Sequence, residues 1–136
     1  MISKTVLTSD DAALALTAAQ AFAKDKGWAV SIAVCDDGGH LLAFVRMPGA
    51  GSVSARIAQG KAQTAAEFRR DTKGIEDMIN GGRTAFLSVP GLDALLEGGL
   101  PVMVNGQCAG AVGVSGVKSD EDAQIARAGV DAMLAG

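Results

Sequence analysis

Four side chains of this sequence could together bind a charged small molecule: His40, Arg46, Lys61 and Ser115. They supply an imidazole, two cations and a hydroxyl, and such a set suits an anionic, carboxylate-bearing ligand. His40 and Arg46 lie on one predicted strand and Lys61 on the predicted helix after it, so we expect His40 and Lys61 to share one pocket. For His40, which follows a glycine-rich turn, a solvated histidine at a strand end explains the sequence equally well.

Lys61 is one of the few residues whose setting needs an explanation. It interrupts the apolar stripe of a predicted helix, and that stripe consists of Ile57, Thr64, Ala65 and Phe68. A cation in an apolar wall needs a negative partner, and Asp36 and Glu67 are the nearest candidates in the sequence. A bound carboxylate would also serve. The alternatives are an ion pair that only stabilises the fold and a lysine whose ammonium group reaches water.

Several other kinds of chemistry lack their sequence patterns. One histidine cannot complete a catalytic triad alone, and Gly113-Val-Ser-Gly116 is one residue too short for a Gly-x-Ser-x-Gly nucleophile turn. The glycine-rich stretches lack the order of a dinucleotide site, and no Walker lysine is present. Cys35 and Cys108 form no Cys-x-x-C pair, which argues against a structural zinc site.

Two predicted hairpins carry most of these residues. In the first, the strand from Trp28 to Cys35 alternates large and small side chains, and a turn at 36–39 leads into a strand from His40 to Met47. The second hairpin spans 98–116, because Asn105-Gly106 is a strong signal for a type I′ turn.

The second hairpin has two further features. Pro101 cannot donate a ladder hydrogen bond, so we expect it at the first position of the incoming strand. Glycines in the outgoing strand, 107–114, indicate close packing of a helix on the sheet or the approach of a ligand; close packing is the better explanation for most of them.

Helices and less regular segments complete the chain. Cap and dipole signals predict a first helix over 9–26. The remaining predicted elements are helices over 52–70 and 71–80, a short strand over 85–89, a turn with a helical fragment over 90–97, and a final helix from 119.

The bulk composition narrows the class of protein. A chain of 136 residues fits one domain, 1–136, and can bury about 68% of its unfolded surface. Hydrophobic residues are 49% of the chain and aromatic residues 4%, so the core should be finely packed, with apolar faces left for a partner subunit. The net charge of −3 without a basic run argues against nucleic-acid binding. No long apolar run or signal-peptide region is present, so we expect a cytoplasmic protein without a membrane partner.

Segments spread over nearly the whole chain resemble the GlcG/HbpS family, also called the haem-degrading-domain family. They are Ala33-Val-Cys-Asp36, Gly39-His-Leu-Leu-Ala-Phe-Val-Arg-Met47, Gly49-Ala50, Ile57-Ala58, Lys61-Ala62, Thr64-Ala65, Gly98-Gly-Leu-Pro101, Gly106, Gly110, Gly113-Val-Ser-Gly116 and Ala126-Arg-Ala-Gly129. Two departures replace carboxylates. Pro48 stands where the family has aspartate in an Arg-Met-Asp-Gly-Ala loop, and Glu121-Asp122-Ala123 stands where a Gln-Asp-Glu run is usual.

The resemblance implies a profilin-like α/β (α+β) fold, in which helices flank an antiparallel five-stranded sheet, assembled into a homo-oligomer. Family members include haem-binding sensors, the C-terminal domain of PduO-type corrinoid adenosyltransferases and proteins of catabolic operons. One hypothesis is an accessory protein that binds haem or a small anionic ligand, with His40 as the only imidazole for the iron.

A second hypothesis is a small catabolic enzyme, a hydrolase, deaminase or tautomerase acting on a carboxylate-bearing metabolite such as an aromatic-degradation intermediate. His40 would be its acid/base, and Lys61 or Arg46 would hold the carboxylate. A purely structural oligomer is the third hypothesis. In each case Cys35 and Cys108 should be buried thiols on antiparallel neighbouring strands.

Overall fold

The cap signals of the first helix are realised in the computed structural model, which describes residues 1–136. Helix α1 (Ser9–Lys26) follows Thr8, whose hydroxyl accepts a hydrogen bond from the amide of Asp11 while the Asp11 carboxylate accepts one from the amide of Thr8. It ends at Gly27, which adopts a left-handed conformation with φ 75°. The predicted bounds of this helix are confirmed, because the Thr8 hydroxyl at one end and the left-handed backbone of Gly27 at the other stop it.

The two predicted hairpins form one antiparallel sheet. Strands β1 (Ser31–Asp36) and β2 (Leu41–Arg46) make the first hairpin, and β3 (Gly99–Val104) and β4 (Gln107–Ser115) make the second. The strand order β2-β1-β4-β3 places β1 and β4 at the centre. Asn105 and Gly106 have φ 50° and 78°, which is the left-handed pair that a type I′ turn requires.

The expectation of five strands is wrong, because the sheet has four. The segment read as a short strand, 85–89, instead forms most of the 3-10 helix η1 (Thr84–Ser88). Strand β3 offers little for a further strand to pair with: the hydroxyl of Thr72 bonds both backbone groups of Gly99, and Pro101 has no N–H. Pro101 is the third residue of this edge strand rather than its first.

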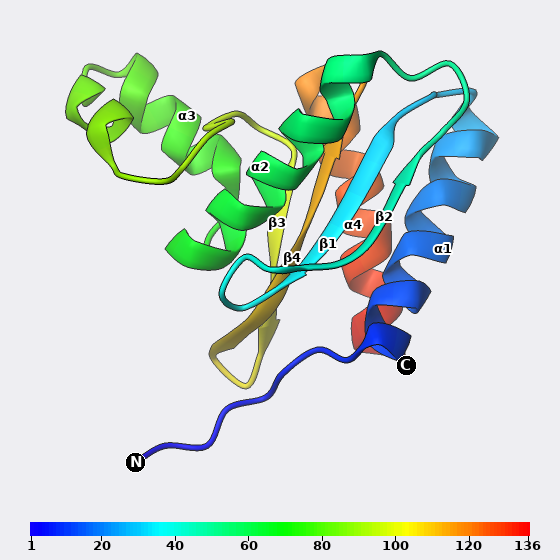
Figure 1. Cartoon of the computed structure of the whole chain (residues 1–136), viewed down its shortest axis with the longest axis horizontal. Helices are drawn as coiled ribbons and strands as arrows, with labels where there is room; N and C mark the ends of the chain where they lie inside the picture. The colour runs from blue at the N-terminus through cyan, green and yellow to red at the C-terminus, as the bar shows by residue number, and fades with distance from the viewer.

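Helices cover both faces of the sheet, as Figure 1 shows. The larger side chains Val30, Ile32 and Val34 pack with α1 and with α4 (Ser119–Ala135) on one face. On the other face, Ala33 and Cys35 pack against α2 (Ser52–Phe68), which contributes four buried alanines. The alternation of large and small residues predicted for this strand is confirmed.

The remaining elements lie beside the sheet. Helix α3 (Thr72–Asn80) and η1 project to the left of it in Figure 1, and the rings of Phe68 and Phe86 lie 6.0 Å apart. The segment 90–97 contains no helical fragment, contrary to expectation. Instead Ala94 adopts a left-handed φ of 55° and Asp93 is held through its carbonyl by Thr64 of α2. No helix in the chain is both long and apolar enough to cross a lipid bilayer.

Helix α2 approaches β4 so closely that glycine is required at the contact. A Cβ on Gly113 would overlap the carbonyl oxygen of Ala58 and the nitrogen of Ala62, and a Cβ on Gly99 would overlap the carbonyl oxygen of Lys61. These obstacles are backbone atoms, which cannot rotate aside. The glycines of this hairpin therefore serve helix-on-sheet packing at these two positions.

We predict that Gly113→Ala lowers the free energy of unfolding by about 3 kcal/mol, since the added methyl group must push α2 away from the sheet. Gly51→Ala is the matched control, because Gly51 has φ −59° and nothing lies within 4 Å of its added Cβ. Its cost should stay below about 1 kcal/mol. Urea denaturation followed by circular dichroism measures both, and equal stability of the two variants would contradict the packing argument.

Candidate functional site

The structure divides the four predicted site residues between the two ends of the sheet. Arg46 and Ser115 are both register partners of Ser31 on β1, so they lie at the same end. His40 precedes β2 at the opposite end, about 20 Å away for six residues of extended chain. The Arg46 Nε donates to the carbonyl oxygen of Ala50 at 3.0 Å, which occupies one of its donors.

Lys61 is buried, with 2% exposure, and its partner lies inside the protein. Its ammonium group donates to Asp122 Oδ2 at 3.1 Å and to the carbonyl oxygen of Val114 at 2.9 Å. Neither Asp36 nor Glu67 is the partner, and His40 does not share a pocket with Lys61. The reason is the direction of the side chain, which passes beneath Gly98, where an added Cβ would come within 2.7 Å of the ammonium nitrogen.

The carboxylate of Asp122 is held as tightly as the ammonium group. It accepts a second hydrogen bond at Oδ1 from the amide of Val117 at 3.1 Å, and 2% of the residue is exposed. Burial raises the pKa of Asp122, although the charge of Lys61 and the Val117 amide act in the opposite direction. Because no buried side-chain nitrogen or oxygen lacks a partner, this ion pair is satisfied without a ligand.

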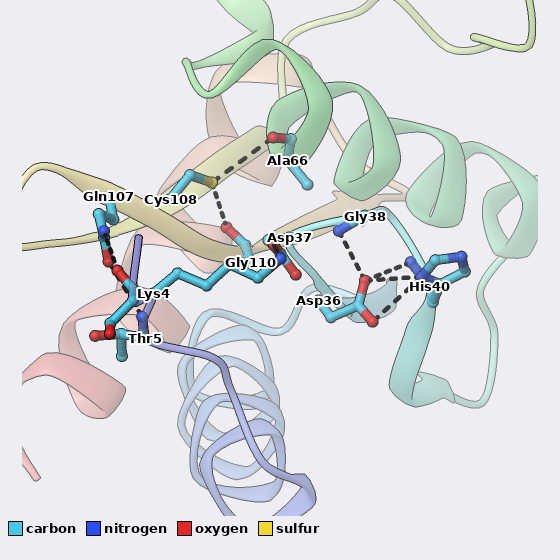
Figure 2. A network of polar contacts seen from close by, with 11 residues as sticks. Lys4, Thr5, Asp36, Asp37, Gly38, His40, Ala66, Gln107, Cys108 and Gly110 are labelled. Atoms are coloured by element: carbon cyan, nitrogen blue, oxygen red, sulfur yellow. Dashed lines mark hydrogen bonds and ion pairs between the residues drawn. The ribbon is translucent and has the colours of Figure 1, made fainter. Parts of the chain in front are cut away.

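His40 is held at the end of the first hairpin by a neighbouring carboxylate (Figure 2). Its Nδ1 lies 3.2 Å from Asp36 Oδ1 and 3.3 Å from Oδ2, and its side chain is 81% exposed. A carboxylate can only accept hydrogen bonds, so in the neutral imidazole this contact assigns the proton to Nδ1 and leaves the lone pair on Nε2. Such an oriented, accessible imidazole suits a metal ligand.

Asp36 is itself fixed in place. Its Oδ1 accepts hydrogen bonds from the amides of Gly38 and His40, both at 2.9 Å. Partial burial, the largest single influence, raises the pKa of Asp36, but these amides together with the imidazole outweigh it, so the pKa is lowered. Asp36 therefore stays ionised near neutral pH and keeps the imidazole oriented.

A pocket of about 600 Å³ opens between α2, the first hairpin and the segment 93–96, and His40 itself is not among its lining residues. The two chain neighbours of His40, Gly39 and Leu41, both line it. Seven of its thirteen lining residues are hydrophobic. The full lining is Cys35, Gly39, Leu41, Val53, Arg56, Ile57, Gln59, Gly60, Ala62, Gln63, Asp93, Ala94 and Leu96. Its size and apolar walls are typical of small-molecule sites.

Sequence reasoning missed two charged residues, Asp122 and Arg56. Asp122 lies 61 residues from Lys61, and no local pattern reports such a contact. Arg56 could have been found, because Val53, Arg56 and Gly60 follow each other at helical spacing and mark one face of α2. That face now lines the pocket.

Comparison with known proteins identifies the family. The family model described as haem degrading protein HbpS-like matches residues 7–131. The chain belongs to the HbpS-like family. It is 53% identical over 115 residues to Protein GlcG of Escherichia coli (strain K12), with 85% of each chain covered. The resemblance to the GlcG/HbpS family is therefore confirmed.

Two solved structures of related proteins share the fold. A double mutant of Streptomyces reticuli HbpS superimposes with a TM-score of 0.88 at 35% identity, covering 96% of this chain and 89% of that one. The PduOC:heme complex superimposes with a TM-score of 0.84 at 27% identity, covering 94% of this chain and 95% of that one. The latter was solved with haem bound to PduOC.

The cysteines of this HbpS-like protein are free and buried, on neighbouring antiparallel strands, as predicted. Burial raises the pKa of Cys35, which lines the pocket, to about 12. Burial also raises the pKa of Cys108, whose thiol donates to the carbonyl oxygens of Ala66 and Gly110 (Figure 2). Both thiols stay protonated at neutral pH, so neither is a ready nucleophile.

We predict that Lys61→Met lowers the free energy of unfolding by about 3–5 kcal/mol, because it leaves the charge of Asp122 buried without a partner. The loss should shrink in acid: Lys61 lowers the pKa of Asp122 against the effect of burial, so without Lys61 that pKa rises further, and the native variant gains more than the wild-type protein from binding a proton as pH falls. Denaturant unfolding at several pH values measures the effect.

Two further variants control this experiment. Lys73→Met removes an exposed lysine 3.3 Å from Asp77, and it should cost far less than Lys61→Met because solvent screens an exposed pair. The double variant Lys61→Met/Asp122→Asn removes both buried charges and should recover most of the loss. If the double variant is stable but binds ligand poorly, Lys61 has a functional role that the ion pair does not explain.

Proposed function

We propose that this protein is an accessory protein that binds haem, with His40 as the axial ligand of the iron. The observation that carries the proposal is the His40–Asp36 pair: Nδ1 is held by a carboxylate at 3.2 Å, and Nε2 is free on an exposed side chain. Metal-ligating histidines generally donate their other ring N–H to a carboxylate, a backbone carbonyl or water, and this contact fixes the ring and raises its basicity. Membership of the HbpS-like family and the haem of the related PduOC complex support the proposal.

The surroundings of His40 fit a flat, largely apolar group. Leu41, the next residue, and Val53 of α2 are 50% and 51% exposed, and both line the adjoining pocket. Haem bound there would provide redox chemistry or binding of a small gas at its iron. The residues of the chain would hold it through His40, orient the imidazole through Asp36 and cover part of the porphyrin with apolar side chains.

The alternative of a hydrolase, deaminase or tautomerase has less support. Its proposed acid/base residue, His40, lies at the opposite end of β2 from Arg46 and does not share a pocket with Lys61, the two candidate carboxylate-binding residues. Lys61 also has two partners already. Cys35 is not an activated thiol. An oriented imidazole beside a pocket serves ligand binding more directly than it serves acid/base catalysis with Lys61.

We predict that His40→Ala abolishes the Soret shift that haemin shows on binding to the wild-type protein, since the axial ligand is lost. Asp36→Asn should keep the ligand but bind about 10–100-fold more weakly, because an outer carboxylate orients the imidazole. Asp37→Asn is the matched control: Asp37 pairs with Lys4 and not with His40, so haemin affinity should be unchanged. An unaltered Soret band in His40→Ala would remove His40 as the ligand.

We also propose that the protein forms a homo-oligomer, because apolar side chains remain exposed away from the pocket. Leu14 of α1, Leu134 of α4 and Leu87 of η1 are 50%, 51% and 65% exposed. A closed symmetric assembly would cover such residues. Sedimentation equilibrium should therefore give a mass above 13.7 kDa at micromolar concentration, and a monomer would contradict the proposal.

A further inference from the structure

Exposed apolar side chains gather at the pocket beside His40. Of the ten large hydrophobic residues exposed on the chain, Leu41, Val53 and Leu96 line this one hollow. They come from three segments that are distant in sequence: the first hairpin, the start of α2 and the loop before β3. Apolar surface collected in a concave site usually binds something apolar.

Arg56 is a cation of the same pocket that has no partner within the chain. Its guanidinium forms no ion pair or hydrogen bond with any other residue of the chain, although it lines the pocket. The amide nitrogens of Gln59 and Gln63 are committed to the carbonyl oxygens of Ala55 and Gly91. Asp93, the only acidic residue of the lining, forms no ion pair with Arg56.

The first hairpin and the loop before β3, which form the walls of the pocket, both pack closely against α2. A Cβ on Gly39 would come within 2.9 Å of Gln63 Cγ, and a Cβ on Gly60 within 2.8 Å of Ala94 Cβ, so the hairpin and the loop both press against the helix. Thr64 holds the loop with a hydrogen bond to Asp93 O at 3.0 Å. Because these walls are preorganised, little conformational entropy of the protein is lost when a ligand binds.

We propose that this pocket binds a carboxylate carried on a flat apolar body, with Arg56 as the carboxylate-binding residue. The apolar walls would pack against the flat apolar part of the ligand, and the Arg56 guanidinium would bind the carboxylate through two parallel hydrogen bonds. Haem propionates and free aromatic acids share this chemistry. If haem carries the carboxylate, the inference rests on the function proposed above. If a free acid carries it, the inference is independent of that function.

The first experiment uses 2-naphthoate and its neutral isostere 2-naphthamide, with binding measured by calorimetry. The wild-type protein should bind the acid at least about tenfold more tightly than the amide, and Arg56→Gln should remove that preference. Arg127→Gln is the matched control, because Arg127 lies on α4 and contacts Asp131 at 3.9 Å. Its affinity for naphthoate should equal that of the wild-type protein.

The second experiment compares haemin with haemin dimethyl ester, whose propionates are blocked. If haem is the source, Arg56→Gln should weaken haemin about tenfold and leave the ester and the Soret position unchanged. An effect of Arg56→Gln on naphthoate alone assigns the pocket to free acids. If Arg56→Gln changes the binding of neither naphthoate nor haemin, the proposal is wrong, whereas His40→Ala tests the axial ligand separately.

Discussion

The close approach of α2 to the sheet is the constraint on which the rest of the structure depends. Gly113 leaves no space for a methyl group beneath Ala58 and Ala62, so the helix lies at a depth set by backbone contact rather than by side chains. At that depth the backbone of Lys61 passes over Gly99, and its side chain can only continue into the protein. The buried ion pair with Asp122 follows from the helix position, and it then fastens α4 to α2.

The same helix position creates the pocket. Gly39 lets the first hairpin lie against Gln63 of α2, and Gly60 of α2 lets Asp93 and Ala94, in the loop before β3, lie against the helix. The hairpin wall and the loop wall of the pocket are therefore both positioned by contact with α2. Ala94 adopts a left-handed conformation there, at a cost that surrounding contacts must offset. A larger residue at position 60 would separate the loop from the helix and open the site.

The sequence predicts those parts of the fold that local chemistry decides. Thr8 and Gly27 end a helix by bonds to their own neighbours, and Asn105-Gly106 turns a hairpin because both residues tolerate positive φ. The alternation from Val30 to Cys35 likewise shows two unlike faces. The partner of Lys61, the 3-10 form of 84–88 and the pocket walls depend on residues far away in the chain, so periodicity could not reveal them.

Two cations of α2 show why burial of a charge alone does not indicate function. Arg56 and Lys61 are five residues apart, which places them about 140° apart around the helix. Lys61 turns inward, where a charge is tolerated only with a carboxylate supplied by the chain, and Asp122 supplies it. Arg56 turns toward the pocket, where water permits a cation to remain unpaired. The residue with the more unusual sequence setting therefore serves the fold, and the ordinary-looking arginine is the one free to bind a carboxylate.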